Sequence, residues 1–260
     1  LSQALDRHLH LPKFSCFSFS LESRYAQFTL CGMKTLFISG NDTDVGKTHV
    51  GTALLATLIA KGRYCVARKP IETGCDETAQ GLIPSDAEAY YHAGQRQFPL
   101  AEICPLRYLP AISPERAIRL AGETIHVHEL VDVCRPAAEV DYLIVEGAGG
   151  LYSPLCTDGL NADLAQALDA EVLLVIGDRL GCINQTLLCL AALQQRQLKP
   201  VAVILNQLHL DDTPSMDNFD DLTRRLSVPV ILFPHASARQ QRIDDALSAM
   251  TDLLEGSNYE

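Results

Sequence analysis

A glycine-rich stretch near the start of the chain has the residue types and spacing of a phosphate-binding loop. It reads Gly-Asn-Asp-Thr-Asp-Val-Gly-Lys-Thr over 40–48, between a short apolar run and a helical pattern. At a helix start, free backbone N–H groups and the positive end of the helix dipole attract phosphate, and a lysine can reach its outer oxygens. Lys47 is therefore a candidate phosphate ligand, and Thr48 is placed to bring its hydroxyl to Mg²⁺.

This loop is a variant of the consensus P-loop. Asn41 holds the position of the first consensus glycine, Gly40 lies one residue earlier, and Asp42 and Asp44 lie within the loop. Acidic residues raise the electrostatic cost of binding ATP unless they face a cation. Asp44 in particular suggests a substrate with positive or hydrogen-bond-donating groups beside the γ-phosphate, and a diamine would suit.

Two other charged residues stand at the ends of predicted strands. Lys69 opens Lys-Pro-Ile-Glu-Thr-Gly over 69–74, and Glu146 lies in Val-Glu-Gly-Ala-Gly-Gly over 145–150. Parallel sheets bind ligands beyond the carboxyl ends of their strands, an acid there is an expected Mg²⁺ ligand, and glycines let the backbone approach a nucleotide. The alternatives are a solvated lysine at a strand end and a strand acid without a metal, which would be costly to bury unpaired.

The surrounding sequence alternates between strand and helix patterns. Six short runs are predicted as buried strands: Thr35–Ser39, Tyr64–Lys69, Tyr142–Glu146, Val172–Gly177, Val201–Asn206 and Val230–Phe233. Helical patterns lie between several of them: Thr48–Ala60, Leu160–Leu168, Asn184–Gln197 and Phe219–Leu226. Such alternation implies βαβ units. We expect a single doubly wound α/β domain, with a mostly parallel sheet and helices on both faces.

The region 75–138 is less regular and contains several prolines among short helical pieces. We interpret it as a long insertion between the second and third strands, carrying helices, and not as a separate domain. Within it, Asp86 follows Pro84 and Ser85 at the start of a helical pattern. Asp86 is a candidate site residue, and the alternative is that Ser85 or Asp86 simply caps the helix.

Composition excludes several classes of protein. The chain has 260 residues, and its 21 Lys and Arg against 32 Asp and Glu give a net charge of −11, which disfavours binding to nucleic acid or to an anionic membrane. No apolar run approaches the roughly 20 residues that span a bilayer. The nine cysteines include no Cys-x-x-Cys pair, so neither a zinc site nor a redox dithiol is indicated and a reducing, cytoplasmic location is expected.

Residues 1–32 differ from the rest. They have no clean periodicity and lack the long apolar segment and the cleavage site of a secretory signal. A transit peptide is the alternative, although arginine is sparse. We predict that residues 1–32 are an extension outside the fold, that 33–260 form the catalytic domain, and that deleting the extension leaves activity unchanged.

Together these motifs resemble the dethiobiotin synthetase family, which are P-loop NTPase-like, ATP-dependent cyclo-ligases. The resemblance runs from Met33 to about Gln240 and covers 40–48, 69–74, 85–86, 145–150, Leu-Gly-Cys-Ile-Asn over 180–184 and Leu-Asn over 205–206. It implies that CO₂ is joined to the two adjacent amines of 7,8-diaminononanoate, with ATP hydrolysed and Mg²⁺ as cofactor. The implied steps pass through a carbamate and a carbamic–phosphoric anhydride.

The resemblance also implies residue roles. Lys69 would be the main catalytic side chain, with Lys47 sharing the charge of the transferred phosphoryl group, and Thr48, Asp86 and Glu146 would bind Mg²⁺. ATP would be bound by Asp44, Val45, Gly46, Lys47, Thr48, His49, Asp86, Gly147, Ala148, Gly149, Gly150, Asn206, Phe233, Pro234 and His235, with Asn206 reading adenine. The substrate would contact Thr43, Thr73, Gly181, Cys182, Ile183 and Asn184, the last four at a helix start that the partner of a homodimer supplies.

Two departures from the family and two other classes of protein bear on this prediction. Arg179 stands where relatives often have lysine, and Glu115 stands where many have histidine.

A partitioning-type nucleotide switch is one alternative, but Asp42 replaces the second lysine that such a protein carries. An amidating enzyme of the cobyrinic acid diamide synthase type is the other, but the chain has no room for its glutaminase domain.

Overall fold

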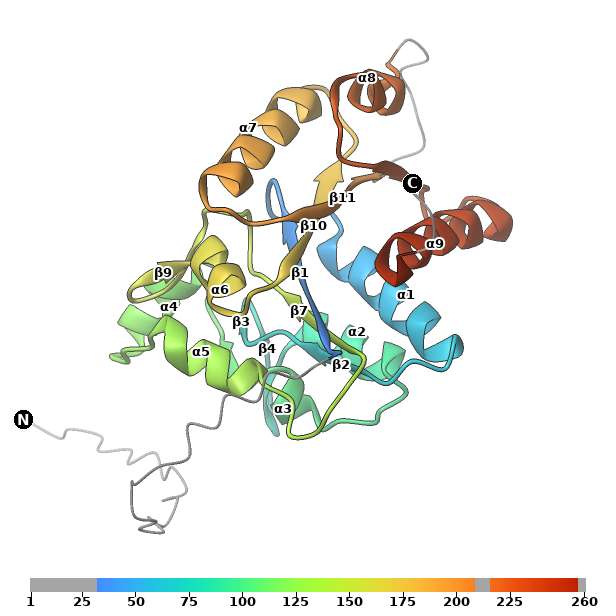
Figure 1. Cartoon of the computed structure of the whole chain (residues 1–260). Helices are drawn as coiled ribbons and strands as arrows, with labels where there is room; N and C mark the ends of the chain where they lie inside the picture. The colour runs from blue at the N-terminus through green and yellow to red at the C-terminus, as the bar shows by residue number, and fades with distance from the viewer. Residues whose placement is uncertain (1–31, 209–215, 257–260) are drawn as a thin grey trace, which may run out of the picture. The chain divides into compact units, whose positions relative to one another are not determined.

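The computed structural model describes residues 32–208 and 216–256 (Figure 1). Gly32–Glu260 make up one unit. The predicted extension falls almost wholly outside the described residues, so its boundary stays a prediction. None of the helices in the described ranges combines the length and the apolar character needed to cross a membrane.

Six parallel strands form the central sheet, in the order β12-β11-β10-β1-β7-β2. Their bounds are β1 (Lys34–Gly40), β2 (Cys65–Arg68), β7 (Tyr142–Glu146), β10 (Glu171–Gly177), β11 (Pro200–Asn206) and β12 (Val230–Phe233). All six were predicted, with ends that differ by one residue at most. The order, with later strands on both sides of β1, is that of a doubly wound sheet and confirms the predicted fold class.

Helices cover both faces of this sheet (Figure 1). One face packs on α1 (Lys47–Ala60), α2 (Ser85–Ala93), α3 (Leu100–Ile103) and α9 (Gln240–Glu255), the last of which was not predicted. The other packs on α4 (Pro114–Leu120), α5 (Val127–Cys134), α6 (Asn161–Ala167), α7 (Cys182–Gln195) and α8 (Asn218–Arg225). Successive strand residues alternate between the two cores, as Ile38 and Phe37 do. Both side-chain faces are therefore buried, which explains the uninterrupted apolar runs.

The insertion over 75–138 carries helices, as predicted, and these are α2 to α5. Short strands that were not predicted lie in it and on either side of it. β3 (Ile71–Thr73) pairs in parallel with β6 (Leu106–Tyr108), and β4 (Asp76–Thr78) forms a hairpin with β5 (Gly81–Ile83). β8 (Pro154–Cys156) and β9 (Gly159–Leu160) form a third small pair after β7. β2 and β3 are separate because Pro70, which has no N–H for a sheet ladder, lies between them.

Strand register fixes which residues meet at the carboxyl edge of the sheet. β7 lies between β1 and β2, where Glu146 is paired with Ile38 and Val145 with Arg68. The residue after Arg68 is Lys69, so this lysine ends beside Glu146. β1 ends two residues beyond Ile38, and the phosphate loop follows it. Three segments far apart in the sequence are therefore brought to one edge.

Candidate active site

A cavity of about 470 Å³ opens at this edge. Its walls come from the loop before α1, the end of β2, the start of α2 and the loop after β7. The lining residues are Thr43, Asp44, Gly46, Lys47, Thr48, His49, Lys69, Glu72, Thr73, Asp86, Glu146, Ala148 and Gly149. The structure thus brings the predicted catalytic residues and metal ligands together in one hollow, with Thr43 and Thr73, the predicted substrate contacts.

The phosphate loop is held in shape by its contact with the end of β11. Gly46 has φ 90°, a left-handed conformation that favours glycine. A Cβ at this position would lie 2.0 Å from Nδ2 of Asn206. Asn206 in turn donates from Nδ2 to the carbonyl of Val45 at 2.9 Å. The residue predicted to read adenine therefore bonds the loop itself through one N–H of its amide, which leaves its second N–H and its Oδ1 for other partners.

Lys47, the first residue of α1, is folded back onto the loop. Its side chain is buried, and Nζ donates to the carbonyl of Asp42 at 2.8 Å. Burial, followed by the nearby positive charge of Lys69, lowers the pKa of Lys47 to about 8. A phosphate bound at this place would supply the negative charge that this lysine lacks, because an opposite charge favours the ionised form.

Asp42, one of the two acidic residues of the phosphate loop, faces a cation. Its Oδ2 atom lies 3.0 Å from a guanidinium nitrogen of Arg179, which follows β10. Asn41 also donates from Nδ2 to Oε1 of Gln185 in α7, at 2.6 Å. The predicted electrostatic cost of Asp42 is thus offset by Arg179, one of the two departures from the family pattern. The loop is tied to the segment between β10 and α7.

Lys69 lies between two acidic side chains. Its ammonium is 2.5 Å from Oε1 of Glu146 and 2.9 Å from Oδ2 of Asp86, and it also donates to the carbonyl of Gly147 at 3.2 Å. Only 3% of Lys69 is exposed. Burial by itself would lower the pKa of Lys69, but the charges of Glu146 and Asp86 outweigh burial and raise it. The two carboxylates therefore favour the charged form of Lys69.

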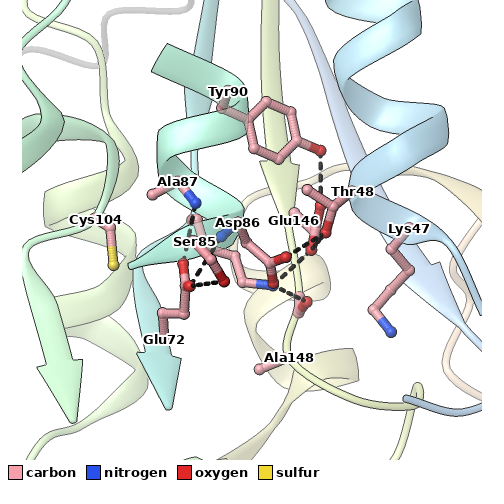
Figure 2. A network of polar contacts seen from close by, with 12 residues as sticks. Lys47, Thr48, Glu72, Ser85, Asp86, Ala87, Tyr90, Cys104, Glu146 and Ala148 are labelled. Atoms are coloured by element: carbon pink, nitrogen blue, oxygen red, sulfur yellow. Dashed lines mark hydrogen bonds and ion pairs between the residues drawn. The ribbon is translucent and has the colours of Figure 1, made fainter. Parts of the chain in front are cut away.

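Thr48 completes this cluster. Its Oγ1 lies 2.8 Å from Oδ1 of Asp86 and 2.9 Å from Oε1 of Glu146 (Figure 2). The three predicted metal ligands therefore offer oxygen atoms close together, which is the ligand type that Mg²⁺ prefers. Within the described ranges no group of three His, Cys, Asp or Glu side chains could hold a metal.

Glu72 was not predicted as a site residue, yet it fixes the position of Asp86. Its carboxylate is buried and accepts hydrogen bonds from the backbone N–H groups of Asp86 at 2.9 Å and Ala87 at 3.0 Å (Figure 2). Ser85 also donates to it at 3.4 Å. The start of α2 is therefore capped by Glu72, because neither Ser85 nor Asp86 caps it as the alternative interpretation required. This leaves the Asp86 side chain for Lys69 and Thr48.

Asn161, also not predicted, holds the loop that follows β7. Its Oδ1 accepts from the N–H of Ala148 at 2.9 Å, and its Nδ2 donates to the carbonyls of Ala148 at 2.7 Å and Gly150 at 2.9 Å. Asn161 is fully buried at the start of α6. Its contacts span most of the Gly147–Gly150 segment. No sequence signal marked Asn161, because these partners lie 11 and 13 residues away across a turn.

Several predicted residues lie outside the cavity lining. These are Val45, Gly147, Gly150, Asn206, Phe233, Pro234, His235, Gly181, Cys182, Ile183 and Asn184. Phe233 is buried in the core and meets the ring of His49 edge to face at 5.4 Å between centroids. Glu115, the other departure, faces Arg119 of the same helix at 3.4 Å and also lies outside the lining. The adenine and carboxylate contacts stay predictions.

Sequence comparisons find matches that cover most of this chain. A family model described as an AAA domain matches residues 34–249. The ATP-dependent dethiobiotin synthetase BioD of Cellvibrio japonicus is 36% identical over 222 residues, covering 85% of this chain and 96% of that protein. The protein of the same name from Aeromonas hydrophila is 35% identical over 201 residues, covering 76% of this chain and 89% of that protein.

Among solved structures, the septum site-determining protein MinD of Pyrococcus horikoshii, complexed with Mg-ADP, has a TM-score of 0.51. It is 16% identical, and the match covers 86% of this chain and 98% of that chain. At this identity the likeness shows the fold alone. A parallel sheet whose first strand runs through a phosphate loop into α1 defines a P-loop α/β protein. The sequence relatives narrow the class further: the chain belongs to the dethiobiotin synthetase family of ATP-dependent ligases.

Proposed function

We propose that this chain closes the ureido ring of dethiobiotin from 7,8-diaminononanoate and CO₂ while converting ATP to ADP and phosphate. The observation that carries the proposal is the position of Lys69, paired with Glu146 and Asp86 in the same cavity as Lys47. Two lysines that line one cavity beside a phosphate loop are suited to a phosphoryl group in transfer between two anionic oxygens.

The chemistry explains why ATP is needed. One amine adds to CO₂ and loses a proton, which gives a carbamate whose oxygen is a poor leaving group. That oxygen attacks the γ-phosphorus of ATP and ADP departs, leaving a carbamic–phosphoric anhydride. The second amine attacks the carbonyl carbon and loses a proton, phosphate leaves, and the ring closes. The site must therefore align the carbamate oxygen, the γ-phosphorus and the leaving oxygen.

The side chains of the cavity divide these tasks. We assign Lys47 to the outer phosphates of ATP and Lys69 to the carbamate oxygen and the phosphoryl group that it accepts. Thr48, Asp86 and Glu146 would hold Mg²⁺, which supplies charge neutralisation at the nucleotide phosphates. We assign Lys69 the role of a positive charge and a hydrogen-bond donor, which its raised pKa favours. The exposed carboxylate of Asp44 lines the same cavity and is suited to an ammonium group of the diamine.

We also propose that the active form is a homodimer in which the start of α7 of one subunit faces the cavity of the other. The backbone N–H groups at a helix start suit a carboxylate, and the substrate has one at the end of its chain. The surface around α7 supports an interface, because Leu180 is 91% exposed and Leu187 and Leu188 are also exposed. Gly181, Cys182, Ile183 and Asn184 would be the contacts.

An assay of substrate dependence tests the proposed reaction. Purified protein with Mg²⁺ and ATP should release ADP only when both 7,8-diaminononanoate and CO₂ or bicarbonate are present, and mass spectrometry should detect dethiobiotin in equal amount. A diamine with its two amines separated by an extra carbon is the control. ATP turnover that is indifferent to the diamine would reject the ligase and favour the nucleotide switch.

A further inference from the structure

A buried tyrosine of α2 contacts the acid at the end of β7. The hydroxyl of Tyr90 donates to Oε2 of Glu146 at 2.8 Å (Figure 2). Oε1 of Glu146 is the oxygen that meets Lys69 and Thr48. Tyr90 and Glu146 are each only 1% exposed, so water does not compete for this hydrogen bond. Each oxygen of this carboxylate therefore has its own protein partners.

The hydroxyl of Tyr90 reaches Glu146 by passing close to Gly51 of α1, which has no side chain. A Cβ at Gly51 would lie 1.9 Å from the hydroxyl oxygen and 2.9 Å from Cζ of Tyr90, and 2.7 Å from Cδ1 of Ile38. Glycine is an unfavourable residue in the interior of a helix, and Gly51 lies in the interior of α1. The close approach of Tyr90 and Ile38 is the physical reason for a glycine at this position, and the hydroxyl makes the tightest contact.

We propose that Tyr90 is a positioning residue for Glu146, and that Gly51 supplies the space it needs. The terminal torsion of a glutamate side chain has only a broad preference, so the carboxylate can rotate unless both of its oxygens are held. The bond from Tyr90 fixes Oε2 and so directs Oε1 toward Thr48 and Lys69. This inference rests on the proposed role of Glu146 in binding Mg²⁺.

The variant Tyr90→Phe keeps the ring and removes the donor. Partners that hydrogen-bond a metal ligand affect metal affinity or activity by about 10- to 100-fold when removed. We therefore expect kcat and the affinity of the protein–ADP complex for Mn²⁺, measured by electron paramagnetic resonance, each to fall by about 10-fold or more. The matched control is Tyr108→Phe, because the hydroxyl of Tyr108 also donates to a carboxylate, that of Glu123, at 2.5 Å. Tyr108 and Glu123 both lie outside the lining of the cavity.

A double-mutant cycle with Gly51→Ala and Tyr90→Phe tests whether Gly51 leaves the space that the Tyr90 hydroxyl occupies. In the native protein, Gly51→Ala should displace the Tyr90 hydroxyl and lower Mn²⁺ affinity about as much as Tyr90→Phe does. In the Tyr90→Phe background the same change should lower Mn²⁺ affinity by a clearly smaller factor, because the closest contact is gone and only those with Cζ of residue 90 and Cδ1 of Ile38 remain. Equal effects of Gly51→Ala in both backgrounds would show that Gly51 does not act through this hydroxyl and would overturn the proposal.

The variant Glu146→Gln separates this inference from the proposed function. Loss of Mn²⁺ affinity in Glu146→Gln together with less than twofold change in Tyr90→Phe would overturn the positioning role and leave the metal role standing. Unchanged Mn²⁺ affinity in Glu146→Gln would instead remove the metal role on which the inference depends. If Tyr90→Phe lowers the unfolding temperature as Tyr108→Phe does but keeps kcat and Mn²⁺ affinity, the hydroxyl is structural only and the proposal fails.

Discussion

The ammonium nitrogen of Lys69 lies 2.5 Å from Oε1 of Glu146, and both side chains are almost completely buried. Glu146 ends β7, and Lys69 directly follows the last residue of the neighbouring parallel strand β2, so the main chain of the sheet fixes the separation of their backbones. A charge buried in this way is stable only with its partner, because burial without one is costly. The pair therefore contributes to stability as well as to the proposed chemistry, and its removal should affect both.

Replacing Lys69 with alanine should reduce kcat by about 100- to 1000-fold, the usual effect of losing one stabilising donor in a transition state. ADP affinity should change little, because Lys47 and the loop backbone remain. The free energy of unfolding, measured in urea, should fall by about 3–5 kcal/mol, because the carboxylates of Glu146 and Asp86 would lose the positive charge that pairs with them. The control Lys61→Ala removes a partly exposed lysine that lies 3.8 Å from Asp252 and donates to Oγ1 of Thr251 at 2.6 Å. It should leave kcat unchanged and lower stability by about 1 kcal/mol at most. A defect confined to ADP binding would contradict the catalytic role of Lys69.

Replacing Asn206 with alanine distinguishes base reading from support of the loop. Because its Nδ2 already donates to the Val45 carbonyl, we expect Asn206→Ala to weaken binding of ADP and GDP by similar factors. Each buried group left without a hydrogen bond costs about 1–3 kcal/mol, which corresponds to about 5- to 150-fold if it is expressed in binding. Isothermal titration calorimetry with both nucleotides measures the ratio. A loss confined to ADP would establish the adenine-reading role that the sequence predicts.

Replacing Asn161 with alanine should loosen the loop that follows β7. It removes the hydrogen bonds to Ala148 and Gly150 in a fully buried place, so the free energy of unfolding should fall by about 2–3 kcal/mol. KM for ATP should rise, since Ala148 and Gly149 line the cavity. Denaturant unfolding and steady-state kinetics on the same preparation provide the check. An unchanged KM with the expected loss of stability would show that the loop does not contact the nucleotide.

Two buried thiols should make the protein less stable in alkali. Burial raises the pKa of Cys134 to about 12 and that of Cys104 to about 12, from an ordinary value of 9.0. Above about pH 9 the unfolded chain loses these protons while the folded chain retains them. Each thiol should therefore lower the free energy of unfolding by about 1.4 kcal/mol per pH unit as pH rises from about 9 toward 12. Below pH 9 neither thiol contributes to pH dependence.

The variant Cys134→Ala should lack one thiol's share of this slope. In urea unfolding, the free energy of unfolding of Cys134→Ala should rise relative to that of the native protein by about 2 kcal/mol as the pH is raised from about 8 to about 10.5. The control is Val131→Ala, which removes buried apolar atoms from the same helix and titrates nothing. Parallel pH profiles for native protein and Cys134→Ala would show that this thiol ionises at similar pH in the folded and unfolded chains.

The amino-acid sequence was sufficient for the strands, the class of sheet and the family. Strands such as Tyr142–Glu146 are recognisable because burial on both faces requires an unbroken apolar run. The loop over 40–48 is recognisable because its shape depends on local features: a glycine that tolerates a positive φ and a lysine at the first position of a helix. Lys69 and Glu146 could be proposed as neighbours because both follow strands whose carboxyl ends share one edge.

Only the tertiary structure revealed what holds those residues in place. Glu72 caps a helix that begins 13 residues later, Tyr90 meets Glu146 from 56 residues away, and Gly51 is required by a side chain from another helix. None of these contacts has a periodicity or a short motif, because each depends on how separate elements pack. Sequence spacing encodes local backbone conformation and burial. The contacts that orient a buried carboxylate are fixed only when the helices and the sheet come together.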